Sequence, residues 1–147
     1  MQRVLAGVAA LLLAGVGGAQ EPSGYPSKEN PFGADYAFEL GKPIQLHVNV
    51  EGVSFDSVTV VALQEVKAGT KVKCEVEFSG AGAAEKKATV TSVLLLEDAT
   101  GKGLERLTLD TFKVKPGKPL DEKQRLSAGA ESLSGATKVY VYIQVVY

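Results

Sequence analysis

The residues best suited to chemistry in this sequence are few, and two of the most informative types occur only once. The chain of 147 residues contains one cysteine, Cys74, and one histidine, His47. A zinc site takes three or four nitrogen, sulfur or oxygen ligands, and a serine triad places a histidine beside a nucleophile on a sharp turn. No such ligand set or turn accompanies these two residues. We therefore expect no metal site, no cofactor and no catalytic residues.

Cys74 lies in the segment KVKCEVEF (71–78), in which charged and apolar residues alternate without a break. Successive side chains of a strand point to opposite faces, so Cys74 belongs to the apolar row and the lysines to the other. A reactive thiol needs nearby cations and partial exposure. The pattern predicts a buried, inert Cys74, and the alternative is an edge thiol or an intermolecular disulfide. His47 falls on the polar face of IQLHVNVE (44–51), which predicts a solvated side chain.

Three acidic residues flank a turn and offer the one alternative catalytic site. Glu97 precedes the turn DATGKG, Asp98 is its first residue, and Asp110 follows it at some distance. Paired carboxylates perform acid–base chemistry in glycosidases, but they need a substrate cleft. We expect these acids to be turn residues and solvated partners of Lys102 or Arg106, and we keep a small hydrolase-like enzyme as an alternative.

The final segment, KVYVYIQVVY (138–147), alternates in a way that places two tyrosines together. Val139, Val141, Ile143, Val145 and Tyr147 share one face. Tyr140 and Tyr142 share the other, either as ordinary surface residues or as a platform for a sugar or a protein partner. A terminal alternating strand is also typical of a small outer-membrane β-barrel, which is a further alternative.

The N-terminus has the three parts of a secretory signal peptide. Arg3 supplies the positive charge, residues 4–16 are apolar or glycine, and Gly17 and Ala19 are small residues before a cleavage site. We expect residues 1–19 to be removed, no insertion into a membrane afterwards, and a periplasmic or extracellular protein. Net charge is −1 and basic residues are not clustered, which argues against nucleic-acid binding.

After the signal, composition divides the chain into two parts. Residues 20–35 are rich in proline, glycine and serine and predict a flexible arm. Residues 36–147 contain alternating runs separated by glycine and proline, which predicts an all-β domain of about seven strands. A phase slip at Val60 and Val61 suggests a bulge, and the run 88–97 is apolar on both faces, as a central strand would be.

This pattern of short strands resembles the immunoglobulin-like and fibronectin-III-like sandwiches of secreted bacterial proteins, at the level of architecture. The resemblance implies a single antiparallel β-sandwich and no particular site residues, because the sequence has one cysteine and no tryptophan. We interpret the chain as an exported, non-enzymatic β-sandwich domain for binding or assembly. Its partner is a protein or a glycan of unknown identity, and its oligomeric state is equally open.

Overall fold

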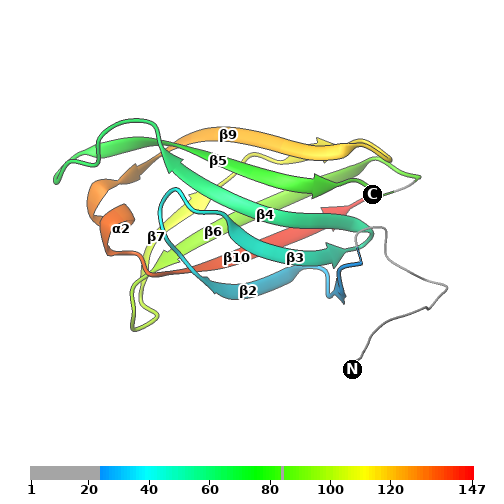
Figure 1. The fold of residues 1–147 in the computed structure, drawn as a ribbon, viewed down its shortest axis with the longest axis horizontal. Helices are drawn as coiled ribbons and strands as arrows, with labels where there is room; N and C mark the ends of the chain where they lie inside the picture. Colours follow the sequence, from blue (N-terminus) through cyan, green and yellow to red (C-terminus); the bar gives the residue numbers. More distant parts are fainter. Residues whose placement is uncertain (1–23, 84) are drawn as a thin grey trace, which may run out of the picture.

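The computed structural model describes residues 24–83 and 85–147, which form two β-sheets packed against each other (Figure 1). The first sheet has the order β1-β3-β4-β5-β9, with bounds Ser27–Lys28, Ile44–Val50, Val53–Ala62, Lys71–Ala81 and Pro119–Gly129. The second has the order β2-β10-β6-β7, with bounds Phe32–Ala37, Lys138–Val146, Ala88–Glu97 and Gly103–Thr108. β8 (Phe112–Val114) also pairs with β6.

The all-β sandwich predicted from the sequence is confirmed, because the strands form two sheets with a shared core between them. The immunoglobulin-like resemblance holds only at the level of a β-sandwich. Among the described residues there are ten strands and not seven. Part of the excess arises in residues 104–115, whose alternation predicts a single strand with a slip in phase. The segment forms two strands, β7 and β8, which pair with different parts of β6.

Alternation in each strand fills the space between the sheets. In β10, the row of Val139, Val141, Ile143 and Val145 is buried. In the same core, phenylalanine rings from both sheets pack together, with ring centroids 6.2 Å apart for Phe55 and Phe78 and 5.9 Å for Phe78 and Phe112. Such aromatic contacts add to the burial of apolar area that stabilises a sandwich.

The irregularity expected at Val60 and Val61 lies elsewhere. Val60 is buried and Val61 is exposed, so the alternation is regular at that point. The register between β4 and β5 shifts instead between Phe55 and Ser57. A bulge places an extra residue in one strand, and here that residue is Asp56. The phase slip was assigned wrongly because the strand begins at Val53, earlier than the sequence pattern indicated.

The segment expected as an arm contributes two strands. β1 pairs in parallel with β3, and β2 pairs with β10 in the other sheet. Between them, Asn30 uses both ends of its side-chain amide: its Nδ2 donates to the Val145 carbonyl at 2.7 Å, and its Oδ1 accepts from the Val145 amide at 3.0 Å. The strands therefore begin before the expected boundary at Tyr36. The signal peptide lies outside the described residues.

Residues 120–136, whose sequence pattern is compatible with a short strand, a helical turn or both, form most of β9 and a short helix, α2 (Ala130–Gly135). Ala130 and Leu133 of α2 are buried at one end of the sandwich (Figure 1). In the described part of the chain, α2 is too short to span a membrane, and no other helix there is long and apolar enough to do so.

Candidate binding face

The outer face of the second sheet carries an apolar strip at its centre. Tyr140 lies opposite Leu95, and Tyr142 lies opposite Val93, on the antiparallel strands β10 and β6. These positions alternate with the buried row of β10, so all four side chains point away from the core. Tyr140 is 37% exposed and the other three are half-buried. We call Tyr140, Tyr142, Val93 and Leu95 the tyrosine platform.

Polar and charged residues border the tyrosine platform on all sides. Across the strands, Asp35 of β2 lies opposite Tyr140, and Arg106 of β7 lies opposite Leu95. Along the strands, one end carries the pair Gln144 and Thr91 and the other end the pair Lys138 and Glu97. An apolar centre with a polar border is the usual anatomy of a recognition site.

Gly33 determines how the Tyr140 side chain lies. Gly33 is on β2, diagonally across from Tyr140 and directly opposite Tyr142. A methyl group placed on Gly33 would overlap the Tyr140 hydroxyl oxygen and would lie 2.6 Å from the ring carbon Cζ. The Tyr140 ring therefore extends over the glycine and along the sheet. The hydroxyl end of the ring lies beside Gly33 of β2.

The surface is hollowed at this point. A shallow depression of ≈ 330 Å³ is lined by the tyrosine platform and by Arg106. Its volume lies at the lower end of the range for small-molecule sites, and its lining is mostly apolar with one cation. The arrangement is suited to holding a small ligand with an apolar side and a polar edge.

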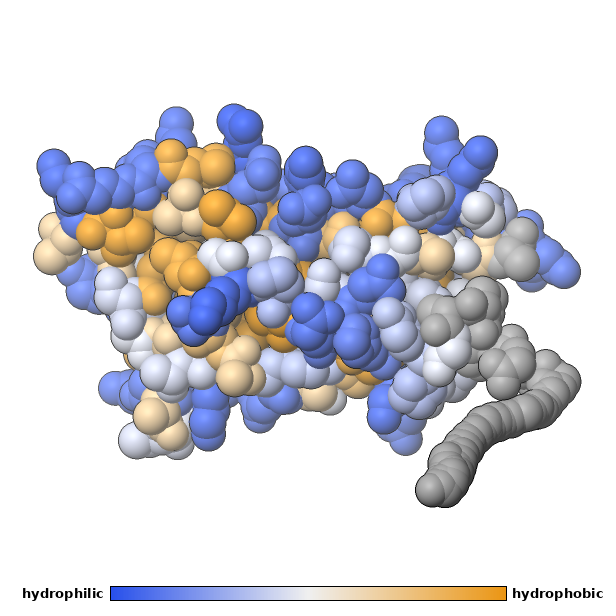
Figure 2. All heavy atoms as spheres, in the orientation of Figure 1, coloured by the Kyte–Doolittle hydropathy of each residue, from blue (hydrophilic) through white to orange (hydrophobic). Residues whose placement is uncertain are grey.

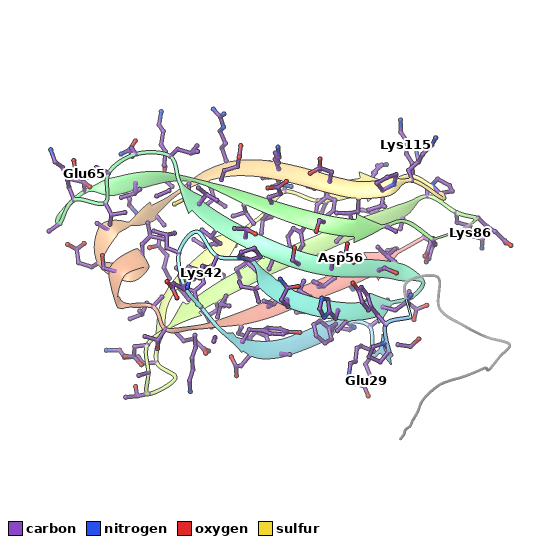
Figure 3. All side chains as sticks on the ribbon, in the orientation of Figure 1. Glu29, Lys42, Asp56, Glu65, Lys86 and Lys115 are labelled. Carbon is purple, nitrogen blue, oxygen red and sulfur yellow. The ribbon has the colours of Figure 1, made fainter. Side chains whose placement is uncertain are left out.

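The outer face of the first sheet has a different character, because ion pairs cross it. Arg125 and Glu75 approach to 3.5 Å between β9 and β5, and Lys123 and Glu77 approach to 3.9 Å on the same two strands. In Figure 2, hydrophilic residues line the edges of the visible face, and hydrophobic ones gather toward the α2 end. Charged residues also occupy the loops at both ends, such as Glu65 at one end and Lys86 at the other (Figure 3). The exposed ion pairs indicate that this face is an ordinary surface in contact with solvent.

A second, smaller apolar patch lies at the end of β4. Val61 is 37% exposed and Leu63 is 43% exposed. Figure 2 shows hydrophobic residues gathered near the α2 end of the molecule, where β4 turns toward β5. Leu63 lines a shallow hollow with Lys73 and Arg125, and no aromatic residue is part of it. The patch provides a matched comparison for the tyrosine platform.

Two carboxyl groups meet at one end of the tyrosine platform. The pKa of Glu97 is raised, first because the carboxyl is partly removed from water and then because it hydrogen-bonds to Asp35 and feels its charge. Lys138, which lies opposite Glu97, lowers the pKa in part. Glu97 and Asp35 therefore lie near each other at this end of the tyrosine platform, with Lys138 beside Glu97.

The three acids that the sequence grouped are not brought together. Asp98 closes its own turn: its Oδ1 accepts from the Thr100 amide at 2.9 Å, the Thr100 hydroxyl at 2.6 Å and the Lys102 amide at 3.0 Å. These bonds, that from the Thr100 hydroxyl first, hold the Asp98 pKa below its usual value.

Asp110 lies far along the same ladder. The amide of its neighbour Leu109 bonds to the Ser92 carbonyl, five residues before Glu97 on β6, which corresponds to roughly 17 Å. The alternative catalytic grouping of Glu97, Asp98 and Asp110 is therefore not formed, because β7 runs antiparallel to β6 and carries Asp110 away from the turn. Asp98 is a turn residue, as expected.

Cys74 is buried in the core, as predicted, and burial raises the pKa of its thiol. His47 is exposed, as predicted, but it is not an isolated surface residue. It has a positive φ of 51° within the bulge of β3, and its ring stacks on Tyr25 with centroids 4.9 Å apart. Among the described residues, no cluster of histidine, cysteine and acidic side chains is arranged to hold a metal ion.

Sequence reasoning selected Tyr140 and Tyr142 but missed the residues around them. Leu95 and Val93 could have been found, since the sequence of β6 is apolar on both faces. Nothing in the sequence pointed to Arg106, Asp35 and Gly33, because only the pairing of β2, β10, β6 and β7 places them beside the tyrosines.

The sequence matches no family model and no curated protein. Solved structures that are similar in part include the following two. The CBM22-1 xylan-binding domain of Paenibacillus barcinonensis Xyn10C is 14% identical, with 80% of this chain and 86% of that chain covered, at a TM-score of 0.31. The enzymatically active domain of tailspike protein 4 of bacteriophage CBA120 is 8% identical, with 96% and 24% covered, at a TM-score of 0.23. Scores of this size identify neither a ligand nor an activity.

Proposed function

We propose that this chain is an exported, non-enzymatic domain that binds a glycan on the tyrosine platform. The observation that carries the proposal is the contrast between the two outer faces. One is crossed by ion pairs and its exposed apolar residues, Val61 and Leu63, include no aromatic ring. The other gathers two tyrosines, a leucine and a valine around a hollow. Exposing such a strip to water is unfavourable unless a ligand covers it.

The size of the site favours a glycan over a folded protein partner. A stable protein interface covers about 800 Å² on each partner, and it is anchored by a central cluster of deeply buried side chains. The tyrosine platform offers four apolar side chains and a hollow of ≈ 330 Å³. That is suited to one or two sugar rings, with the polar border bonding their hydroxyl groups.

Affinity electrophoresis in gels containing soluble polysaccharides tests the proposal. The double variant Tyr140→Ser/Tyr142→Ser should lose the retardation shown by the wild-type protein while keeping its circular dichroism spectrum. The matched control is Val61→Ser/Leu63→Ser, which removes exposed apolar residues from the other face. Retention of binding by the tyrosine variant, or equal loss in the control, would refute the site.

Export rests on the signal peptide and is tested separately. We expect the protein recovered outside the cytoplasm to begin at Gln20. Its intact mass should lack residues 1–19, and a mass that includes them would contradict cleavage at this position.

A further inference from the structure

Resting on the proposed function, we infer that the tyrosine platform selects electrically neutral carbohydrate, with Gly33 as the residue that positions Tyr140 for stacking. Charge on the border, open hydrogen-bonding groups and the place of the Tyr140 ring support this choice independently of one another.

Charged residues of both signs border the tyrosine platform, in equal number. Asp35 and Glu97 are acidic, and Lys138 and Arg106 are basic. Asp35 and Arg106 stand at opposite ends of one cross-strand row, three strand spacings apart, which is about 14 Å. A uniformly charged polymer crossing this row would be attracted electrostatically at one end and repelled at the other. Recruitment of a charged ligand requires a field of one sign, and this face does not provide one.

Hydrogen-bonding groups at the border are free to bind a ligand. Within the described part of the chain, the side chains of Arg106, Tyr142 and Gln144 have no hydrogen-bond partner; nor does the Tyr140 hydroxyl. Arg106 can only donate, and Gln144 and the tyrosine hydroxyls both donate and accept. Sugar hydroxyl groups donate and accept equally, so a polyhydroxyl ligand can satisfy every one of these side chains without carrying a charge.

The Tyr140 ring supplies the apolar half of the contact. Because it extends over Gly33, it exposes ring surface rather than only its hydroxyl tip. An aromatic face is electron-rich and attracts the weakly positive C–H groups that cover one side of a pyranose ring. Any side chain at position 33 would occupy the place of the Tyr140 hydroxyl and lift the ring. Gly33 therefore acts through Tyr140 and is a positioning residue.

The experiment compares Gly33→Ala with Gly103→Ala on the full mature chain. Gly103 lies on the same outer face, but a methyl group there would meet only Leu95 carbons at 3.5 Å or more, which is ordinary contact. Affinity electrophoresis is performed with three neutral polymers, a mannan, a dextran and a β-glucan, and two charged ones, polygalacturonate and heparin. Titration calorimetry then gives the dissociation constant for the polymer that binds, and thermal melting confirms folding.

We expect retardation by at least one neutral polymer and by neither charged one, with binding unchanged between about 0.05 and about 0.5 M salt. Gly33→Ala should weaken binding at least tenfold at an unchanged melting temperature, and Gly103→Ala should bind like the wild type. If Gly33→Ala fails to fold, Tyr140→Ala and Tyr140→Phe replace it: the first should abolish binding and the second should largely retain it.

The outcomes separate this inference from the proposed function. Tyrosine-dependent binding to a charged polymer alone would leave the proposed function standing and overturn the selection of neutral ligands. Wild-type binding by Gly33→Ala would overturn the positioning role. Retardation by none of the five polymers would overturn the glycan site itself, and the inference with it.

Discussion

Neighbouring residues of β10 should respond in opposite ways to truncation, because they face opposite sides of the second sheet. Ile143 is fully buried between Phe32 and Ser92 on the flanking strands, and Tyr142 lies on the tyrosine platform. Ile143→Ala removes buried methyl and methylene groups and leaves a cavity, which costs about 2–5 kcal/mol. Tyr142→Ser removes a half-buried side chain from the outer face and should cost about 1 kcal/mol or less.

These costs are large compared with the stability of a single domain, which is about 5–15 kcal/mol. For a domain of this length each kcal/mol lowers the melting temperature by about 4 °C, so Ile143→Ala should melt roughly 8–20 °C below the wild type. Tyr142→Ser should remain within about 4 °C of it. Thermal melting followed by circular dichroism, with urea unfolding as a second measure, provides the comparison.

A result in the opposite order would refute the assignment of the two faces. If Tyr142→Ser destabilised the domain as much as Ile143→Ala, the tyrosine would be a core residue and the tyrosine platform would not be open to a ligand. A small effect of both substitutions would show that β10 is not at the centre of the sheet.

Three further predictions follow from the buried thiol, the N-terminal segment and the carboxyl pair. Cys74→Ser should lower the free energy of unfolding by about 1–3 kcal/mol, because the serine hydroxyl enters an apolar row. In the wild-type protein, Cys74 should resist a thiol reagent until the protein unfolds, and fast labelling of the native protein would contradict this. Asn30→Ala removes two hydrogen bonds to the Val145 backbone and should cost about 1–3 kcal/mol in urea unfolding, whereas an unchanged midpoint would show that the segment before β2 is not held. Glu97 has a raised pKa, so its contribution to stability is present below the ordinary glutamate pKa and is lost as pH rises through the raised value. Glu97→Gln should therefore melt above the wild type at pH 7, by a margin that shrinks as pH falls, and a margin that grows in acid would contradict the pairing with Asp35.

The sequence by itself determined which residues are inside. Alternation along a strand has a period of two and depends only on neighbouring residues, so it assigns faces before any strand finds its partner. On that basis Cys74 was placed in the core, and Tyr140 and Tyr142 were placed opposite the buried row of β10. The all-β class followed from the same local signal, because no segment sustained a helical period.

Only the tertiary structure decided which residues of different strands lie beside one another. Gly33 and Tyr140 are brought together because β2 pairs with β10, although the first strand stands near the start of the domain and the second at its end. Arg106 joins the same face through the pairing of β7 with β6, and the same antiparallel pairing carries Asp110 away from Glu97.

The alternation of residues cannot specify these neighbours. It indicates which face of a strand is apolar, but it does not indicate which other strand will pair with that strand. Strand order is settled when all the apolar rows are buried at once and every interior backbone group finds a partner. The tyrosines were therefore visible in the sequence, but the site they form with Gly33 and Arg106 exists only in the folded sheet.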